Sequence, residues 1–217
     1  MFDLEGTLVL SGWQDPKYVE EFRKMTKNKL IELGIPRGIL EGVKRSTMMR
    51  NTASDYVERV FTAKKAKQFY SKMEHFLRKY ELLAAKRSRI FPETIATLTR
   101  LRSFGFKLGL ITNTSKEVAD LIISKHGLQS FFEVIVTRED VKRLKPDPEG
   151  ILLAIKYLGE SIFFFVGDES YDALAAKNAG GLSILVKRSL SRNDEPFSDF
   201  KVTSLNGIIP HIVRHAR

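Results

Sequence analysis

The chain has 217 residues, of which 43% are hydrophobic and 29% charged, a composition typical of a globular protein with one larger domain and an insertion. It contains no cysteine, which excludes disulfides and thiolate metal sites. No apolar run approaches the roughly 20 residues that span a bilayer. The N-terminus carries an acid and no basic region typical of a signal peptide, so we expect a cytoplasmic protein with no membrane partner.

The net charge of +10 is concentrated in one segment. Residues 11–90 hold 19 of the 36 basic residues and 9 of the 26 acidic residues, and the rest of the chain holds 17 of each. Concentrated positive charge attracts anions by long-range steering. A solvated lysine-rich helical surface is the simpler interpretation, and a nucleic-acid surface lacks any recognised module.

Two acids stand near the start, where Asp3 and Glu5 follow an apolar residue and precede a Gly-Thr turn. At the end of a strand, such a pair can divide its work, one acid attacking and the other moving protons. A simple turn is the alternative for Asp3. Only Met1 and Phe2 precede Asp3, fewer than the about five residues of an ordinary strand. We therefore expect a truncated central strand and lower stability than in a longer form.

Four apolar stripes at helical spacing predict a four-helix unit over residues 14–88. Gly34 and Pro36 would end the first helix, and the third would start near Thr52. The stripes pack as a bundle core rather than as a ligand site. In chain order they contain Tyr18, Phe22, Met25 and Leu33; Ile39, Leu40 and Val43; Tyr56, Val57, Val60 and Phe61; and Ala66, Phe69, Met73, Phe76, Leu77 and Tyr80.

From Phe91 onward, short apolar strands alternate with amphipathic helices. Strands are predicted at 106–111, 132–136, 162–166 and 182–186, and helices at about 98–104, 115–126, 147–158 and 172–179, with Ser115 capping the second of these. This alternation predicts an α/β fold with a doubly wound parallel sheet. Ligands of such sheets bind beyond the carboxyl ends of the strands.

Polar residues follow the predicted strands at that edge. They are Asp3 and Glu5, Thr112 and Asn113, Lys145 in Lys-Pro-Asp-Pro, and Asp168 and Asp172. Each also has a simpler interpretation. The last two acids complement a helix dipole, the lysine lies on the surface, and the threonine caps a turn. His211 and His215 share a face of the last helix and, with no third ligand, are cationic helix ends.

Four motifs in this order resemble the haloacid dehalogenase superfamily of phosphohydrolases. They read Asp3-Leu-Glu5-Gly-Thr7, Leu-Ile-Thr112-Asn-Thr, Lys145-Pro-Asp-Pro and Val-Gly-Asp168-Glu-Ser-Tyr-Asp172. One such motif is weak evidence, whereas four in order are strong. The resemblance covers the whole chain, and residues 199–205 are similar to the closing strand and helix of the family. It implies a Rossmann-like core of residues 1–13 and 89–217 and an inserted helical cap of residues 14–88.

The resemblance also implies a role for each motif residue. Asp3 would attack phosphorus and form an aspartyl-phosphate. Glu5 would protonate the leaving oxygen and then activate water. The Thr112 hydroxyl would donate to a phosphoryl oxygen beside the Asn113 backbone. Lys145 would neutralise charge on Asp3 and on the phosphoryl group.

Mg²⁺ is the implied cofactor, bound by Asp3, the Glu5 carbonyl and Asp168, with Asp172 supporting the ion or its water. A phosphate dianion repels a carboxylate nucleophile, so a divalent cation together with Lys145 must offset the charge. Oxygen ligands with retained water suit Mg²⁺. Both lines of reasoning predict the same cofactor.

Glu5 departs from the usual family pattern, which has Asp two residues after the nucleophile. The enolase-phosphatase branch is similar in having Asp-x-Glu-Gly-Thr, so catalysis is retained as the expectation. The residue argues against the dehalogenase branch, which places Tyr there, and against phosphonate hydrolysis, which usually has Ala. Glu reaches one methylene further at similar intrinsic pKa.

We therefore expect a Mg²⁺-dependent phosphatase, monomeric or homodimeric, acting on a small phosphorylated metabolite such as a phosphoglycolate-like, sugar or nucleotide monophosphate. Residues 9–13 would line the entrance, with Trp13 equally able to pack at the cap hinge. Three alternatives stay open. They are a phosphomutase of the same family, a nucleic-acid end phosphatase acting through the basic cap, and a non-catalytic anion-binding protein.

Overall fold

The computed structural model describes residues 1–160, 162–188 and 197–215. Its centre is a parallel sheet in which Phe2 lies between two strand groups, bridging Leu110 on one side and Val166 on the other. Phe2 N–H donates to the Gly109 carbonyl at 2.8 Å, and Asp3 N–H donates to the Val166 carbonyl at 2.9 Å. The strands lie in the order β4 (Val134–Val136), β3 (Gly109–Ile111), Phe2, β5 (Phe164–Gly167), β6 (Leu182–Val186) and β7 (Phe200–Val202).

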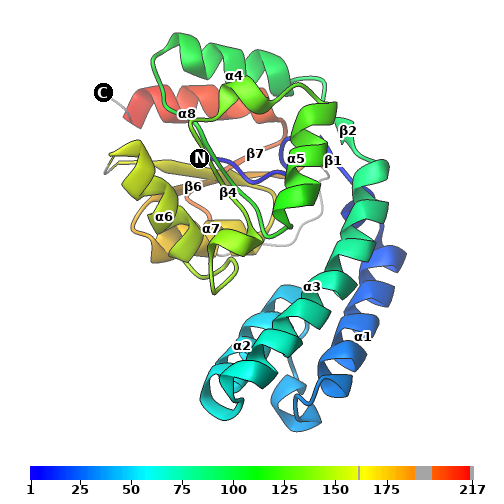
Figure 1. Cartoon of the computed structure of the whole chain (residues 1–217). Coiled ribbons are helices and arrows are strands. Elements are labelled where there is room, and N and C mark those ends of the chain that lie inside the picture. The colour runs from blue at the N-terminus through cyan, green and yellow to red at the C-terminus, as the bar shows by residue number, and fades with distance from the viewer. Residues whose placement is uncertain (161, 189–196, 216–217) are drawn as a thin grey trace.

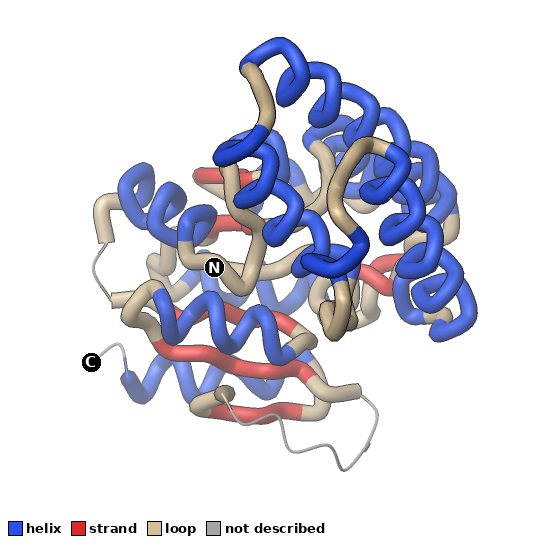
Figure 2. Tube along the Cα trace, turned by 90° about the horizontal axis from the view of Figure 1, so that it is seen from below, coloured by secondary structure: helices blue, strands red, loops and turns tan. Residues whose placement is uncertain are grey.

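Helices cover both faces of this sheet (Figures 1 and 2). One face packs against α4 (Thr94–Ser103), α5 (Lys116–Lys125) and α8 (Ile208–His215), and the other against α6 (Glu149–Leu158) and α7 (Ser170–Asn178). In β5 the side chains of Phe164 and Val166 enter the first cluster and Phe165 enters the second. Both faces are buried, which explains the continuous apolar strand sequences and confirms the doubly wound prediction.

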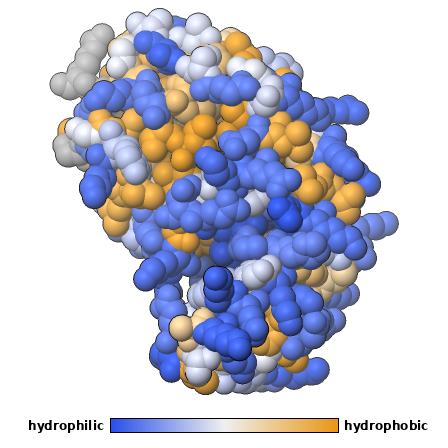
Figure 3. Space-filling model, viewed as in Figure 1, coloured by the Kyte–Doolittle hydropathy of each residue, from blue (hydrophilic) through white to orange (hydrophobic). Residues whose placement is uncertain are grey.

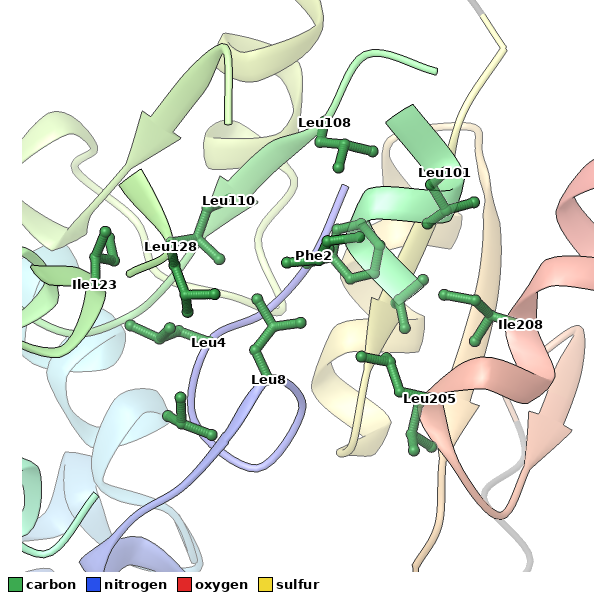
Figure 4. Close-up of a cluster of buried hydrophobic side chains, with 14 of the residues drawn as sticks. Phe2, Leu4, Leu8, Leu101, Leu108, Leu110, Ile123, Leu128, Leu205 and Ile208 are labelled. Atoms are coloured by element: carbon green, nitrogen blue, oxygen red, sulfur yellow. The ribbon is translucent and has the colours of Figure 1, made fainter. Parts of the chain in front are cut away.

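The N-terminal residues run through the middle of the larger cluster (Figure 4). Phe2, Leu4 and Leu8 pack there beside Leu110 and Leu205. The chain leaves the sheet at the carboxyl end of this central position, and Asp3 therefore stands at the edge where ligands bind in such folds.

A helical segment, residues 14–88, projects from the sheet (Figure 1). It contains α1 (Pro16–Glu32), α2 (Ser46–Val60) and α3 (Ala63–Lys86). Its apolar stripes form a separate core that includes Phe22, Leu30, Met49, Phe69 and Met73. The two connections to the sheet pair as antiparallel strands β1 (Val9–Leu10) and β2 (Arg89–Ile90), which the sequence did not predict. No helix in the described ranges is long and apolar enough to cross a membrane.

The prediction of a second helix in this segment is wrong. Residues Arg37–Leu40 form only a short 3-10 turn, although Leu40 is buried in the segment's core as its apolar character predicts. Gly38 and Gly42 interrupt the stretch, and Gly42 adopts a left-handed φ of 75° that a helix does not accommodate. The third helix also begins earlier than predicted, at Ser46 rather than near Thr52. The segment is thus three α-helices and a turn.

Candidate active site

Lys145 is the centre of the polar edge. Its ammonium group donates to Asp3 Oδ1 at 2.5 Å, to Asp172 Oδ1 at 2.7 Å and to the Ile111 carbonyl at 3.1 Å. Burial lowers the pKa of Lys145, but Asp172 and Asp3 outweigh burial and raise it above its ordinary value. The side chain is 5% exposed, so the surface-lysine interpretation is wrong and the group stays charged.

Three carboxylates converge around this ammonium. Oxygen atoms of Asp3, Asp168 and Asp172 all lie within 4.8 Å of one another. Burial raises the pKa of Asp3 to about 7 against the opposing effect of Lys145. Burial, followed by Asp172 and Asp3, raises the pKa of Asp168 well above its usual range. Three carboxylates and one ammonium leave surplus negative charge on oxygen-only donors, and this set fits a divalent cation such as Mg²⁺.

Asp172 serves two purposes. Its Oδ2 accepts the backbone N–H groups of Asp168 and Glu169, both at 3.1 Å, while its Oδ1 pairs with Lys145. The two bonds from Oδ2 cap the N-terminus of α7, which agrees with the helix-dipole interpretation for Asp172 but not for Asp168. The capping role fixes the orientation of the carboxylate and leaves the second oxygen directed into the site.

Gly6 and Thr7 place the first loop against Asp168. Gly6 has a φ of 92°, and a Cβ there would lie 2.2 Å from Asp168 Oδ2, so only glycine fits. The Thr7 hydroxyl donates to Asp168 Oδ1 at 3.4 Å. Arg188 holds the loop from outside, donating to the carbonyls of Gly6 at 2.7 Å and Thr7 at 3.0 Å.

Glu5 lies in the same cavity as Asp3. Its Oε1 atom is buried and accepts no hydrogen bond from the described residues. Burial raises the pKa of Glu5 to about 8, a direction that favours the protonated carboxyl group near neutral pH. The three-carboxylate cluster does not include the Glu5 side chain, and coordination by the Glu5 carbonyl stays a prediction.

Thr112 and Asn113 follow β3, as predicted. The Thr112 oxygen accepts the Thr114 N–H at 3.3 Å, an arrangement that leaves the hydroxyl proton for another acceptor. The Asn113 side chain bonds the backbone of Lys145 in both directions, donating to its carbonyl at 3.3 Å and accepting its N–H at 3.0 Å. The Asn113 side chain therefore positions Lys145, a role that sequence reasoning missed.

Ser115 occupies the N-cap position of α5 but does not cap it with its side chain. Its backbone N–H instead donates to Glu81 Oε2 at 3.3 Å, a contact from α3 of the helical segment. The hydroxyl is buried and has no hydrogen-bond partner among the described residues. The predicted cap is right in position and wrong in its hydrogen bond.

The cavity above the three carboxylates has a volume of about 590 Å³. The sheet edge forms one wall, and the helical segment forms the other with Arg23, Arg45 and Arg50, while Trp13 lines the cavity where the chain enters this segment. Hydrophilic residues cover most of the segment's surface in Figure 3. Of the predicted entrance residues 9–13, Val9 is buried in β1, whereas Trp13 lines the cavity.

Trp13 also packs against α1, with ring centroids 5.1 Å from Tyr18 and 4.8 Å from Phe22. Both of its predicted interpretations hold. The two late histidines are structural, because the His211 and His215 rings lie 4.6 Å and 5.1 Å from Phe200. Within the part of the chain described here, neither belongs to a possible metal cluster.

Arg138 is a residue that sequence reasoning missed. It is 2% exposed and donates from Nε to Glu74 at 2.9 Å, from two nitrogens to Glu81, and from Nη1 to the Asn113 carbonyl at 3.3 Å. Both glutamates lie on α3, so Arg138 joins the helical segment to the sheet edge. Its position two residues after β4 was the available signal, since the other site residues also follow strands.

Comparisons with known proteins agree with this geometry. Residues 1–186 match the family of haloacid dehalogenase-like hydrolases. A phosphoglycolate phosphatase from Photorhabdus laumondii subsp. laumondii is 31% identical over 185 residues, 82% of this chain and 75% of that protein. The pyrophosphatase PpaX from Bacillus velezensis is 40% identical over 86 residues, 39% of this chain and 40% of that protein.

A solved structure is also similar along nearly the whole chain. The HAD phosphatase from Thermococcus onnurineus has a TM-score of 0.56 and 25% sequence identity, covering 98% of this chain and 95% of that chain. The family match, which spans most of the sequence, and the order of the four motifs lead to one conclusion. This chain belongs to the haloacid dehalogenase-like hydrolases.

Proposed function

We propose that this hydrolase is a Mg²⁺-dependent phosphatase of small phosphate monoesters that works through an aspartyl-phosphate on Asp3. The observation that carries the proposal is the Lys145 ammonium, held between Asp3 and Asp172 at 2.5 and 2.7 Å in a buried cavity. The names of the phosphoglycolate phosphatase and pyrophosphatase relatives support the reaction class. As part of the same proposal, the enzyme is cytoplasmic.

The proposal includes a division into a core of residues 1–13 and 89–217 and a cap of residues 14–88. The apolar clusters support it, because the one within the helical segment is separate from the two that cover the faces of the sheet. The paired strands β1 and β2 stand where the chain passes from one part to the other. In this arrangement the cap covers the cavity and excludes water from the reacting phosphate.

Asp3 is the nucleophile in the first step. Its carboxylate oxygen attacks phosphorus while the bond to the ester oxygen breaks, and Lys145 opposes the rise in the pKa of Asp3 that burial causes. Asp3, Asp168 and Asp172, with the Glu5 carbonyl, would hold Mg²⁺. When bound, the ion offsets the negative charge shared by the phosphate and the carboxylates.

Glu5 moves the proton in both steps. With its pKa raised to about 8, it carries a proton at neutral pH and donates it to the departing ester oxygen. The resulting carboxylate then accepts a proton from the water that attacks the aspartyl-phosphate. Glu5 Oε1 supports this role, because no hydrogen bond from the described residues occupies it and a substrate oxygen or water can bond there. The Thr112 hydroxyl donates to a phosphoryl oxygen.

The test is phosphate release from p-nitrophenyl phosphate and phosphoglycolate in the presence of Mg²⁺. We expect turnover by the wild type, and its loss both with EDTA and in Asp3→Asn. Turnover that survives in a folded Asp3→Asn variant would sink the nucleophile assignment. If the wild type releases no phosphate but exchanges it with a sugar bisphosphate, the phosphomutase alternative would replace the phosphatase.

A further inference from the structure

Arg188, which follows the end of β6, bonds the backbone of the loop that carries Glu5. Its Nη1 donates to the Gly6 carbonyl at 2.7 Å, and its Nη2 donates to the Thr7 carbonyl at 3.0 Å. Gly6 and Thr7 directly follow Glu5 in the chain. Two nitrogens of one planar guanidinium group therefore set the orientation of two consecutive peptide units.

The guanidinium group is itself held in place. Its Nη2 also donates to Glu93 Oε1 at 3.1 Å, and its carbon lies 3.4 Å from the centroid of the Phe91 ring. Glu93 Oε1 in turn accepts the Leu205 N–H at 3.3 Å. The side chain of Arg188 is only 23% exposed. Because a ring and a carboxylate fix this cation, it can impose a position on the loop that it bonds.

The loop transmits this position to Glu5, because it is a tight turn closed by its own hydrogen bonds. The Gly6 N–H donates to the Val9 carbonyl at 2.7 Å, and the Leu8 N–H donates to the Leu4 carbonyl at 2.9 Å. Glu5 lies between the residues that these bonds join. A shift of the Gly6 peptide therefore turns the backbone of Glu5 and moves its carboxyl group.

Asp168, which Thr7 of the same loop contacts, has anchors of its own. Its N–H donates to Asp172 Oδ2 at 3.1 Å, and its carbonyl accepts a hydrogen bond from Lys187 Nζ at 2.5 Å. Glu5 Oε1, by contrast, accepts no hydrogen bond from the described residues. Loosening the loop should therefore displace the Glu5 carboxyl group more than the carboxylate of Asp168.

We propose that Arg188 is a positioning residue for proton transfer, because its bonds to the Gly6 and Thr7 carbonyls keep the Glu5 carboxyl group where the ester oxygen departs. Arg188 is not among the residues that line the cavity, and it acts only through the loop. The inference rests on the proposed function, which assigns the proton to Glu5. Loss of Arg188 should resemble a partial loss of Glu5 and should preserve the binding of the divalent cation.

Two esters separate this role from a general loss of structure. Propyl phosphate needs a proton on its departing oxygen, whereas p-nitrophenyl phosphate releases a stable anion. In Arg188→Met we expect kcat/KM to fall about tenfold or more for propyl phosphate and less than about threefold for p-nitrophenyl phosphate. Arg102→Met is the matched control, because Arg102 bonds the backbone carbonyl of Ser130, outside the cavity. It should lower kcat/KM for neither ester.

Glu5→Gln provides the second comparison. If Arg188 acts through Glu5, adding Arg188→Met to Glu5→Gln should lower kcat/KM for propyl phosphate by less than about twofold, because the proton donor is already absent. Arg188→Gln, with a shorter amide donor, replaces Arg188→Met if that variant does not fold. An equal loss for both esters, no loss for either, or a further tenfold loss in the double variant would overturn the proposal.

Two measurements without turnover complete the test. Amide hydrogen exchange of residues 4–9 should be faster in Arg188→Met than in the wild type, and the rise in melting temperature with Mg²⁺ should be retained. If p-nitrophenyl phosphate is hydrolysed by the wild type but the exchange is unchanged or the rise is lost, the phosphatase stands and the positioning role is wrong. If the wild type hydrolyses neither ester, the proposed function fails and the role of Arg188 in proton transfer fails with it.

Discussion

Asn51 and Leu144 are joined by two reciprocal hydrogen bonds. The Asn51 amide donates to the Leu144 carbonyl at 2.9 Å, and its oxygen accepts the Leu144 N–H at 3.0 Å. Asn51 lies on α2, and Leu144 is the neighbour of Lys145 in the chain. Both residues are buried, so one side chain satisfies two backbone groups that water cannot reach. The helical segment is thus fastened to the loop that presents the active-site lysine.

Asn51→Leu should destabilise the protein and slow catalysis. The substitution keeps the shape but leaves the N–H and C=O of Leu144 unpaired, at a cost of about 2 kcal/mol or more in unfolding free energy. Because the Lys145 loop loses its anchor, kcat/KM should fall as well. Urea denaturation and phosphate release measure the two effects. Asn28→Leu, on the exposed surface of α1, is the control. Wild-type stability in Asn51→Leu would contradict the anchoring role.

Glu5→Gln should reduce kcat/KM by roughly 10²–10⁴-fold for an alkyl phosphate. Gln cannot donate an acidic proton, so the departing alkoxide leaves without assistance. A nitrophenolate leaves readily by itself, and the loss for p-nitrophenyl phosphate should be much smaller. The ratio kcat/KM is the right quantity because it reports the step that forms the aspartyl-phosphate. Equal losses for both esters would argue against Glu5 as the general acid.

Mg²⁺ should raise the melting temperature of the wild type. The cation binds the folded cluster of three carboxylates, relieves their mutual repulsion and stabilises the native state by mass action. Asp168→Asn should abolish most of this rise, whereas Asp120→Asn, an exposed acid on α5, should leave it unchanged. Thermal denaturation with and without Mg²⁺ gives the comparison. A rise that is undiminished in Asp168→Asn would place the ion elsewhere.

Glu93 should make the unfolding free energy depend on pH in the acidic range. Burial alone would raise its pKa, but hydrogen bonds from its own backbone, Leu205 and Arg188 hold the pKa below the usual 4.5. A lowered folded-state pKa means that the unfolded chain binds the proton more tightly. The stabilisation is therefore complete above about pH 4.5 and is lost as the pH falls through the folded-state pKa.

Glu93→Gln tests this dependence. The variant should be less stable than the wild type at pH 7, and the difference in unfolding free energy should shrink as the pH is lowered below 4.5. Denaturation at a series of pH values measures it. A difference that stays constant between pH 7 and pH 3 would show that the ionised carboxylate is not what stabilises this contact.

The residues at the sheet edge could be predicted because each of them directly follows a strand in the sequence. In a parallel sheet the carboxyl ends of the strands meet at one edge, so Asp3, Thr112 and Asp168 could be brought together from strand positions alone. The position of Lys145 was ambiguous in the sequence, and its burial in the structure resolves this ambiguity. Lys145 could have been a surface residue, and only the packing of its loop puts it between two carboxylates.

The contact between the two walls of the cavity could not be predicted. Arg138, after β4, meets Glu74, the partner of Arg50, only because α3 docks on the sheet edge at one particular angle. Helical periodicity states which face of a helix is apolar, and it carries no information on that angle. The predicted helix around Arg37–Leu40 failed for a different reason, since Leu40 is buried in a short 3-10 turn rather than in a helix.

Glu81→Leu should lower the unfolding free energy far more than Glu117→Leu, although each substitution removes one salt bridge that involves α3. The Arg138–Glu81 pair has side chains that are 2% and 6% exposed, and those of Arg78–Glu117 are 47% and 58% exposed. Removing one partner of a buried pair leaves the other charge in a low-dielectric interior, which costs about 3–5 kcal/mol. An exposed pair is screened by water and contributes about 1 kcal/mol or less.

Chemical denaturation of the two variants gives this comparison directly. In Glu81→Leu, Arg138 keeps Glu74 as its one carboxylate partner among the described residues, and the Ser115 N–H loses its acceptor. The docking of the helical segment therefore weakens with the loss of charge balance. Turnover of p-nitrophenyl phosphate should fall in the same variant, because Arg138 also bonds the Asn113 carbonyl. Equal stability of the two variants would mean that the Arg138–Glu81 pair is hydrated in solution and does not fasten the helical segment to the sheet edge.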